Sequence, residues 1–233
     1  MQTVSETYRL ARADPSAWHE YKAIVDGVEY GQARIMGAPE TVKSLFSGNT
    51  PTIGCCVAQT VRIALIDPSP HPSRMAEIQL FCRVHGNGVI SEWIPKGVFY
   101  IDTRDSKSTP GVLILEGYDA MLKMESEFTQ GVDDGNWPRS MPVLMDDIAE
   151  RIGVEIENAA DIPEYMVPYT EDLTMREIAG YIAVAAAGNW IITDAGNLRL
   201  VKFGVVPEAP INGSVLVTED GYAITFGGVR IIV

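Results

Sequence analysis

The sequence predicts a mixed α+β fold that is predominantly β: a β-barrel-like domain, then a small α+β domain and the start of a second β domain. Three observations predict it. Apolar and polar residues alternate in several segments before residue 117, an Asp-Gly pair joins two of these segments, and apolar stripes at helical spacing follow after residue 140. The composition, with 46% hydrophobic and 21% charged residues in 233, is typical of a globular chain.

The first elements are a short helix and a hairpin. Residues 5–13 read as a helix that Pro15 stops, because proline cannot continue a helix. Residues 18–25 and 28–36 read as paired strands joined by Asp26-Gly27, since this pair tolerates the positive φ angles that a tight hairpin requires. The sequence therefore predicts that the β domain starts with a tightly turned hairpin.

Two further strands have one apolar face each. Residues 57–66 and 76–84 alternate apolar and polar side chains, which is typical of strands buried on one side. Residues 67–73 between them contain three prolines, which lack the backbone donors of a ladder, so they form a loop.

The next two strands are apolar on both faces. Residues 97–103 contain Val98 to Ile101, and residues 111–116 contain Val112 to Leu115. A strand of this kind is covered twice, inside a closed barrel or sandwich or by a neighbouring subunit. Residues 14–117 thus form a compact β domain, followed by a short helix over residues 118–124.

The pattern becomes helical after a polar connector at residues 129–139. The first helix has its apolar stripe at Leu144, Ile148, Ala149 and Ile152 and ends at Gly153.

The second helix opens at Thr174 with Glu177 three residues later, the spacing of a capping box. Gly188 closes it, and its apolar stripe is formed by Ile178, Tyr181, Ile182 and Ala185. Residues 190–193 and 198–203 then form a hairpin around a turn at 194–197.

Residues 204–210 form a linker with two prolines, and residues 214–218 and 222–233 read as strands. We therefore expect three domains: residues 1–128, the N-terminal helix with the β-barrel-like domain; residues 140–203, the small α+β domain; and residues 211–233, the beginning of a second β domain. Because the last strand has no closing turn, we expect the natural polypeptide to be longer.

Charge and hydropathy exclude two classes of partner. The chain has 18 Lys and Arg against 31 Asp and Glu, a formal charge of −13, so it repels phosphate backbones and sequence-specific nucleic-acid binding is disfavoured. No apolar run approaches about 18 residues, so no membrane insertion is expected. The first five residues lack a secretory pattern, and Cys55, Cys56 and Cys82 are expected to be free buried thiols.

No set of reactive groups converges in the sequence. His19, His71 and His85 lack metal-ligand spacing, and the acidic pairs Asp146-Asp147 and Glu171-Asp172 read as solvated helix flanks. The acidic stretch at residues 133–136 reads as a turn and lacks the ligand pattern of a calcium loop, and residues 86–88 read as a turn, not a phosphate-binding loop. No catalytic, cofactor-binding or metal-binding residue is therefore predicted.

Aromatic residues leave one alternative open. Trp93, Trp137 and Trp190 could stack sugar rings, although each falls at a strand or domain edge where packing explains it. The alternative function is a carbohydrate-binding or adhesion module of a tail or surface protein. A fragment of a tail-associated cell-wall hydrolase is a third possibility, and it requires two carboxylates in a cleft.

In the order and spacing of its elements, the chain resembles the hub proteins of bacteriophage and prophage tails. The resemblance is carried by residues 91–101 (SEWIPKGVFYI), 117–124 (GYDAMLKM), and 174–182 (TMREIAGYI) followed by 198–204 (LRLVKFG). With the flanking strands it covers about residues 18 to 230.

The resemblance implies a non-enzymatic structural subunit of the virion tail. In similar proteins a β-barrel-like domain and its later repeat form a trimeric ring that continues the tail tube, and a small α+β domain lies on the outside. The implied partners are further copies in a homotrimer and other tail proteins, namely the tail tube or distal tail protein and the spike or tape measure. Because family members usually continue into a second ring domain, any activity of such an extension stays unassigned.

Overall fold

The fold comes from a computed structural model that describes residues 4–48, 50–128, 137–170 and 172–203, together with the backbone of residues 225–226 and 229–230. Residues 1–202 form one unit and residues 203–233 a second, and each is described by itself. None of the helices in these residues is long and apolar enough to cross a membrane.

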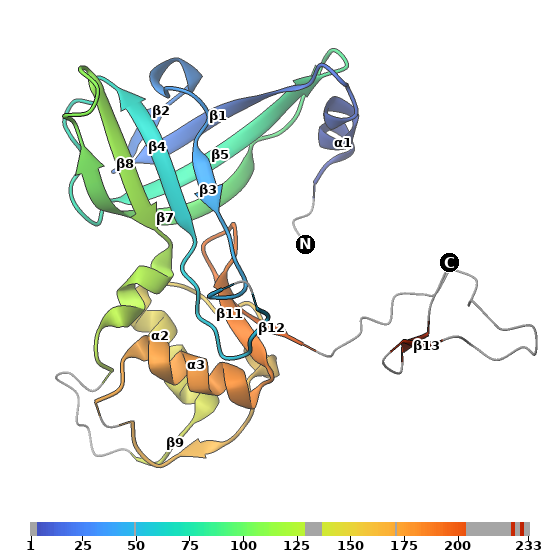
Figure 1. The fold of residues 1–233 in the computed structure, drawn as a ribbon, viewed down its shortest axis with the longest axis vertical. Coiled ribbons are helices and arrows are strands. Elements are labelled where there is room, and N and C mark those ends of the chain that lie inside the picture. The colour runs from blue at the N-terminus through green and yellow to red at the C-terminus, as the bar shows by residue number, and fades with distance from the viewer. Residues whose placement is uncertain are drawn as a thin grey trace, which may run out of the picture. The chain divides into compact units, whose positions relative to one another are not determined.

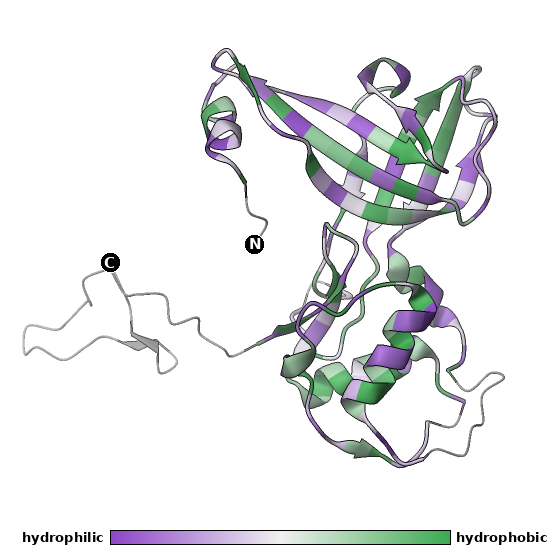
Figure 2. Ribbon diagram, turned by 180° about the vertical axis from the view of Figure 1, so that it is seen from behind, coloured by the Kyte–Doolittle hydropathy of each residue, from purple (hydrophilic) through white to green (hydrophobic). Residues whose placement is uncertain are grey.

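One antiparallel sheet dominates the first half of the chain (Figure 1). Its strands are β1 (Trp18–Val25), β2 (Val28–Tyr30), β3 (Glu40–Val42), β4 (Thr60–Ile66), β5 (Glu77–Gly86), β6 (Val89–Ile90), β7 (Ile94–Asp105) and β8 (Val112–Tyr118). They pair in the order β2-β1-β5-β7-β8-β4-β3, and β6 pairs with β5. Apolar and polar residues alternate along the long strands (Figure 2), as the sequence predicts.

The N-terminal helix and the first hairpin are confirmed. Helix α1 (Glu6–Arg12) is capped by Ser5, whose hydroxyl accepts a hydrogen bond from the Tyr8 amide. At the hairpin turn Asp26 and Gly27 have φ angles of 52° and 77°, the left-handed values that the Asp-Gly pair tolerates.

The predicted barrel is not closed by hydrogen bonds, and the second predicted strand is shorter than expected. It breaks after Tyr30 into a 3₁₀ turn, η1 (Gln32–Arg34), and then Ile35 bridges Leu65 on β4. Within the described residues no pairing joins β2 to β3, so the sheet is open. The chain itself spans the gap, because the same segment pairs with β1 before the 3₁₀ turn and with β4 after it.

One of the doubly apolar strands, β7, is partly covered in a way that the sequence did not predict. The inward side chains of both strands lie in the core of the sheet, whereas part of the outward face of β7 lies against the chain's own second half. A Cβ built on Gly196 would lie 3.1 Å from the Val98 side chain, and Lys123 Nζ lies 3.7 Å from the centroid of the Tyr100 ring. The chain itself therefore covers part of the outward face of β7.

The second half contains helices α2 (Met141–Ile152) and α3 (Met175–Ala185) beside the hairpin of β11 (Gly188–Ile192) and β12 (Leu198–Lys202). Both helices and the hairpin were predicted. Shorter elements are η2 (Ala120–Glu125), η3 (Ala159–Asp161), β9 (Arg139–Ser140) and β10 (Met166–Val167). The short helix predicted at residues 118–124 is thus a 3₁₀ helix, while Gly153 ends α2 with a left-handed φ of 76°.

Two details of α3 were predicted wrongly. Tyr181 and Ala185, both assigned to the apolar stripe, are exposed, Tyr181 to 63%, and Ala179 and Ala183 are buried instead. Gly188 does not cap the helix but begins β11, where a Cβ would lie 2.5 Å from the Val201 carbonyl oxygen. A glycine is required at this position because the two strands of the hairpin approach so closely.

Two hydrophobic cores fill the first unit. One lies in the sheet and includes Ile63, Phe99 and Leu115. The other is centred on Trp190 between α2, α3 and the hairpin, and Met121 and Phe128 from the first half of the chain contribute to it. The two halves are therefore joined by shared packing as well as by the connector.

Several predictions fall outside the described residues: the connector at 129–136, the linker at 204–210 and the strand at 214–218. Within the strand predicted at 222–233, β13 (Thr225–Phe226) pairs with β14 (Val229–Arg230) in antiparallel fashion. The described residues of this stretch thus form two short paired strands and not one continuous strand.

Candidate functional site

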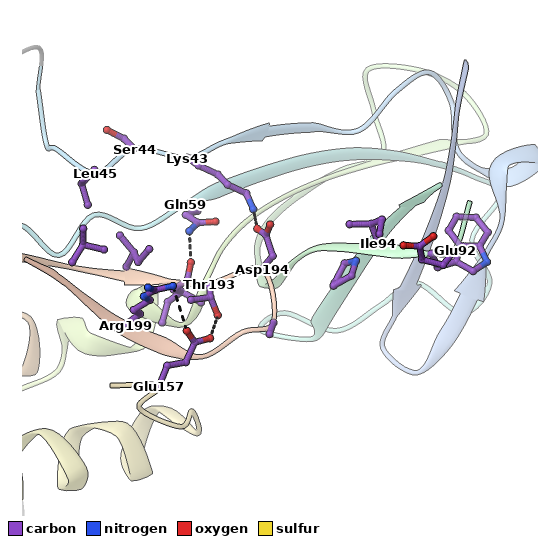
Figure 3. A pocket seen from close by; sticks show the side chains of 16 residues that line it. Lys43, Ser44, Leu45, Gln59, Glu92, Ile94, Glu157, Thr193, Asp194 and Arg199 are labelled. Atoms are coloured by element: carbon purple, nitrogen blue, oxygen red, sulfur yellow. Dashed lines mark hydrogen bonds and ion pairs between the residues drawn. The ribbon is translucent and has the colours of Figure 1, made fainter. Parts of the chain in front are cut away.

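A pocket of about 710 Å³ lies between the start of β7 and the β11–β12 hairpin (Figure 3). Its walls come from residues 43–45 after β3, residues 92–95 and residues 191–195, with Gln59, Glu157, Arg199 and Val201 completing it. We call it the junction pocket, because it lies where the sheet meets the α+β half.

Gln59 links the two halves at this pocket. It precedes β4 and is only 6% exposed. Its backbone exchanges hydrogen bonds with Asp119, donating to Asp119 Oδ2 at 2.9 Å and accepting from the Asp119 amide at 3.1 Å. Its side-chain Nε2 donates to the carbonyl oxygen of Ile192 at the end of β11. The end of β11 is therefore tied to the first residues of β4.

Asp119 is the buried carboxylate behind this link. It is 1% exposed and caps η2, its Oδ1 accepting from the Met121 amide at 3.0 Å. Burial raises the pKa of Asp119 to about 6, since removing a carboxylate from water disfavours its charged form more than two amide donors favour it. Its position behind the wall makes it a structural group.

The rim of the junction pocket carries paired charges. Lys43 forms an ion pair with Asp194, across the mouth between the segment after β3 and the hairpin turn. Glu157 accepts a hydrogen bond from the Thr193 hydroxyl at 2.8 Å and lies 4.0 Å from Arg199 Nη1. With Glu92 also in the lining, two cationic side chains stand against three anionic ones, so most of the charges in the pocket are paired.

Trp93 forms the aromatic part of the lining. The guanidinium carbon of Arg83 lies 4.4 Å from its ring centroid, and Lys22 Nζ lies 5.0 Å from it. Arg83 is itself held by Glu20 through two hydrogen bonds of 2.8 and 3.0 Å. These contacts restrict the orientation of the indole, which is only partly buried.

The other two tryptophans do not join Trp93. Trp190 is 0% exposed, and its indole N–H donates to the Ala179 carbonyl at 3.0 Å, so it belongs to the core and cannot stack a ligand. Trp137 is half-buried and packs against Tyr169, with ring centroids 5.2 Å apart. Of the three residues considered for sugar stacking, only Trp93 lines the junction pocket.

The histidines and acidic pairs also stay apart. His85 stacks on Trp18 at 4.0 Å and bonds Glu20 at 2.5 Å, while Asp147 pairs with Arg139 at 2.6 Å. No group of three or more His, Cys, Asp or Glu residues in the described part of the chain could hold a metal ion. Glu171 and residues 133–136 lie outside that part.

The three cysteines are free, but they are not equally buried. Cys56 and Cys82 are buried, and burial raises the pKa of Cys56 to about 12, which makes it an inert core thiol. Cys55 is half-buried, contrary to expectation, and its Sγ lies 3.0 Å from the Thr52 hydroxyl.

Most residues of the junction pocket could not be found in the sequence. Lys43, Gln59, Glu157 and Asp194 belong to four separate segments and form no spaced motif. Trp93, an aromatic at a strand edge, was the one signal. Chemically, the lining offers balanced hydrogen-bond donors and acceptors around an apolar wall, an arrangement suited to binding a ligand.

Comparison with solved structures shows which fold this is. The chain is similar to the 43 kDa tail protein of prophage MuSo2 from Shewanella oneidensis, with a TM-score of 0.50 and 11% identity over 79% of this chain and 56% of that one. A tail protein from Neisseria meningitidis MC58 matches with a TM-score of 0.49 and 13% identity over 78% of this chain and 50% of that one.

The chain thus spans about half the length of these two proteins. At 11% identity, the likeness to the Shewanella protein establishes the fold alone. No family model and no curated protein matches the sequence.

Proposed function

We propose that the chain is a structural, non-enzymatic subunit of a phage or prophage tail, part of the tail-tip or baseplate hub, where copies form a ring that continues the tail tube. The observation that carries this proposal is the fold shared with the Shewanella prophage tail protein. In this proposal residues 1–128 form the ring, residues 140–203 lie outside it and residues 211–233 begin a second ring domain.

The open sheet offers a surface for self-association. Among the described strands β3 pairs only with β4, and its outward residue Val42 is 64% exposed. Beside it Met36, Ala64 and Ile114 line a hollow of about 270 Å³. We call these four residues the β3 edge surface. An exposed strand edge with apolar neighbours favours pairing with another chain, and cyclic closure would bury it.

A trimer is the proposed closed form, and its proposed partners are the tail tube or distal tail protein and the spike or tape measure. The proposed location is the virion tail. The net charge of −13 supports a ring through which DNA passes without adhering, because like charges repel at short range.

Light scattering coupled to size exclusion tests the proposal. We expect a species of three times the 25.4 kDa chain mass whose fraction grows with protein concentration. Electron microscopy of this fraction should show rings with a central opening. A monomer at every concentration up to the solubility limit would contradict the proposed ring.

A further inference from the structure

We propose that the junction pocket binds a neutral oligosaccharide, with Trp93 as its stacking wall. This binding function goes beyond the structural role, and four features of the pocket carry it: its size, its paired rim charges, an acceptor that no described residue uses and an aromatic ring held by its neighbours.

Size and composition suit a ligand of this class. Pockets that bind small molecules typically have volumes of about 300–1,000 Å³ and combine apolar walls with a few placed polar groups. The junction pocket, at about 710 Å³, has Ile94, Pro95 and Val201 among its apolar residues, and hydrogen-bonding side chains around its rim.

The pairing of the charges favours a neutral ligand. Lys43 and Arg199 lie beside Asp194 and Glu157 as partners, and the third anionic group, Glu92, accepts hydrogen bonds from the Ser5 amide and hydroxyl. An anionic or cationic ligand would compete with one member of each pair and leave the other unmatched. Sugar hydroxyls both donate and accept, so they can add hydrogen bonds to both members without displacing either.

Gln59 supplies an acceptor that the described residues do not use. Its Nε2 donates to Ile192, whereas its Oε1 accepts no hydrogen bond from any described residue. Gln59 belongs to the pocket lining, so this oxygen is available to a bound molecule. A ligand hydroxyl there would donate a hydrogen bond to it.

Trp93 supplies the aromatic wall in a fixed orientation. Arg83 and Lys22 lie over its ring, and Glu20 holds Arg83, so little side-chain freedom remains to be lost on binding. An indole is a large apolar surface on which the C–H face of a sugar ring can pack.

The backbone around the pocket argues against an extended peptide as the ligand. Peptides that bind in extended form pair with a free strand edge. Here the outer edge of β11 is occupied, since the Trp190 amide donates to the Cys55 carbonyl at 2.9 Å. The edge of β12 is occupied as well, by the bond from the Leu198 amide to the Glu155 carbonyl at 2.8 Å. The pocket therefore offers side chains, and not a free strand edge, to a ligand, and this is the kind of contact that a sugar makes.

An array of printed oligosaccharides, probed with the labelled full-length chain, tests the proposal, followed by calorimetry with the strongest neutral glycan. We expect saturable binding that Trp93→Ala weakens at least tenfold. Trp137→Ala is the matched control, because it removes a second half-buried indole outside the pocket, and it should leave the affinity unchanged.

Arg199→Ala is the second variant, because Arg199 is exposed at the rim and its removal leaves the core intact. We expect it to weaken binding severalfold. If the Trp93→Ala variant does not fold, the affinity of the Arg199→Ala variant tests the proposal by itself. The proposal is overturned if no neutral glycan binds, if both pocket variants bind as the parent does, or if only Trp137→Ala loses binding. The oligomeric mass is measured without glycan. A result against the proposed ring is therefore distinguishable from a result against glycan binding in the junction pocket.

Discussion

Burial gives Asp119, which lies behind the Gln59 link, a role that the other acidic residues do not have. Most of the 31 acidic residues contribute to a solvated surface, whereas Asp119 is 1% exposed and accepts two backbone hydrogen bonds. Its pKa of about 6 lies above the ordinary value of 3.8, so its ionised form is disfavoured in the folded protein. The stabilising contribution of neutral Asp119 is present below the ordinary value and is lost as pH rises through 6.

Asp119→Asn should remove this pH dependence. The asparagine side chain stays neutral at every pH. It has one acceptor oxygen and one NH₂ group, whereas Asp119 accepts from two backbone amides, so one of these two hydrogen bonds is lost at every pH. We expect the free energy of unfolding of the parent to fall between pH 4 and pH 7, whereas that of the variant should not show this fall. The difference should reach up to about 3 kcal/mol, because each unit of pKa shift corresponds to about 1.4 kcal/mol. Urea unfolding across this range measures the difference, and parallel profiles would show that Asp119 does not titrate as described.

At the scale of elements, the two long helices begin in different ways. The N-cap residue of α3 is Thr174, whose hydroxyl accepts from the Glu177 amide at 3.2 Å while the Glu177 carboxylate accepts from the Thr174 amide at 2.8 Å. The N-cap residue of α2 is Ser140, whose side chain makes no capping hydrogen bond. The capping box was predicted from the sequence because both partners lie within four residues.

Thr174→Ala should therefore lower the free energy of unfolding by about 1 kcal/mol, the usual effect of removing a capping side chain. Ser140→Ala is its matched control at the other helix and should change it by less than about 0.5 kcal/mol. Denaturant unfolding of both variants gives the comparison, and equal effects would mean that the capping box contributes nothing measurable.

At the scale of the whole first unit, an open sheet is joined to a second core, against which Tyr100 of β7 packs. Because the outward side of β7 is partly covered by the chain itself, the surface proposed for assembly lies at the other end of the sheet, at β3, β4 and β8. Val42 is the most exposed apolar residue of that end.

Val42→Asp should dissociate the proposed ring. A carboxylate placed beside Glu40 on the β3 edge surface would be buried without a partner in each interface, and this is strongly unfavourable. We expect the mass measured by light scattering to shift to the monomer at concentrations where the parent is trimeric, with an unchanged circular dichroism spectrum. Val143→Asp, at a 48% exposed site on α2, should stay trimeric. If the Val42→Asp variant stays trimeric, the interface between the subunits does not include β3.

Much of the fold follows from the sequence because it depends on near neighbours. The Asp26-Gly27 turn, the alternation in β4 and β5, the stripe of α2 and the capping box each involve residues a few positions apart. Their geometry is set by backbone sterics and local hydrogen bonds, which the residue types specify directly.

Only the tertiary structure decided which outward faces are covered and where a pocket forms. The bond from Gln59 to Ile192 joins residues 133 positions apart, and the Cys55 amide bonds Asn189 across 134. No periodicity or motif encodes such distances, since they depend on how two cores pack against each other. The sequence by itself determined the elements and their order, and packing between distant segments determined that Trp190 is core, that Trp93 lines the junction pocket and that the sheet stays open at β3.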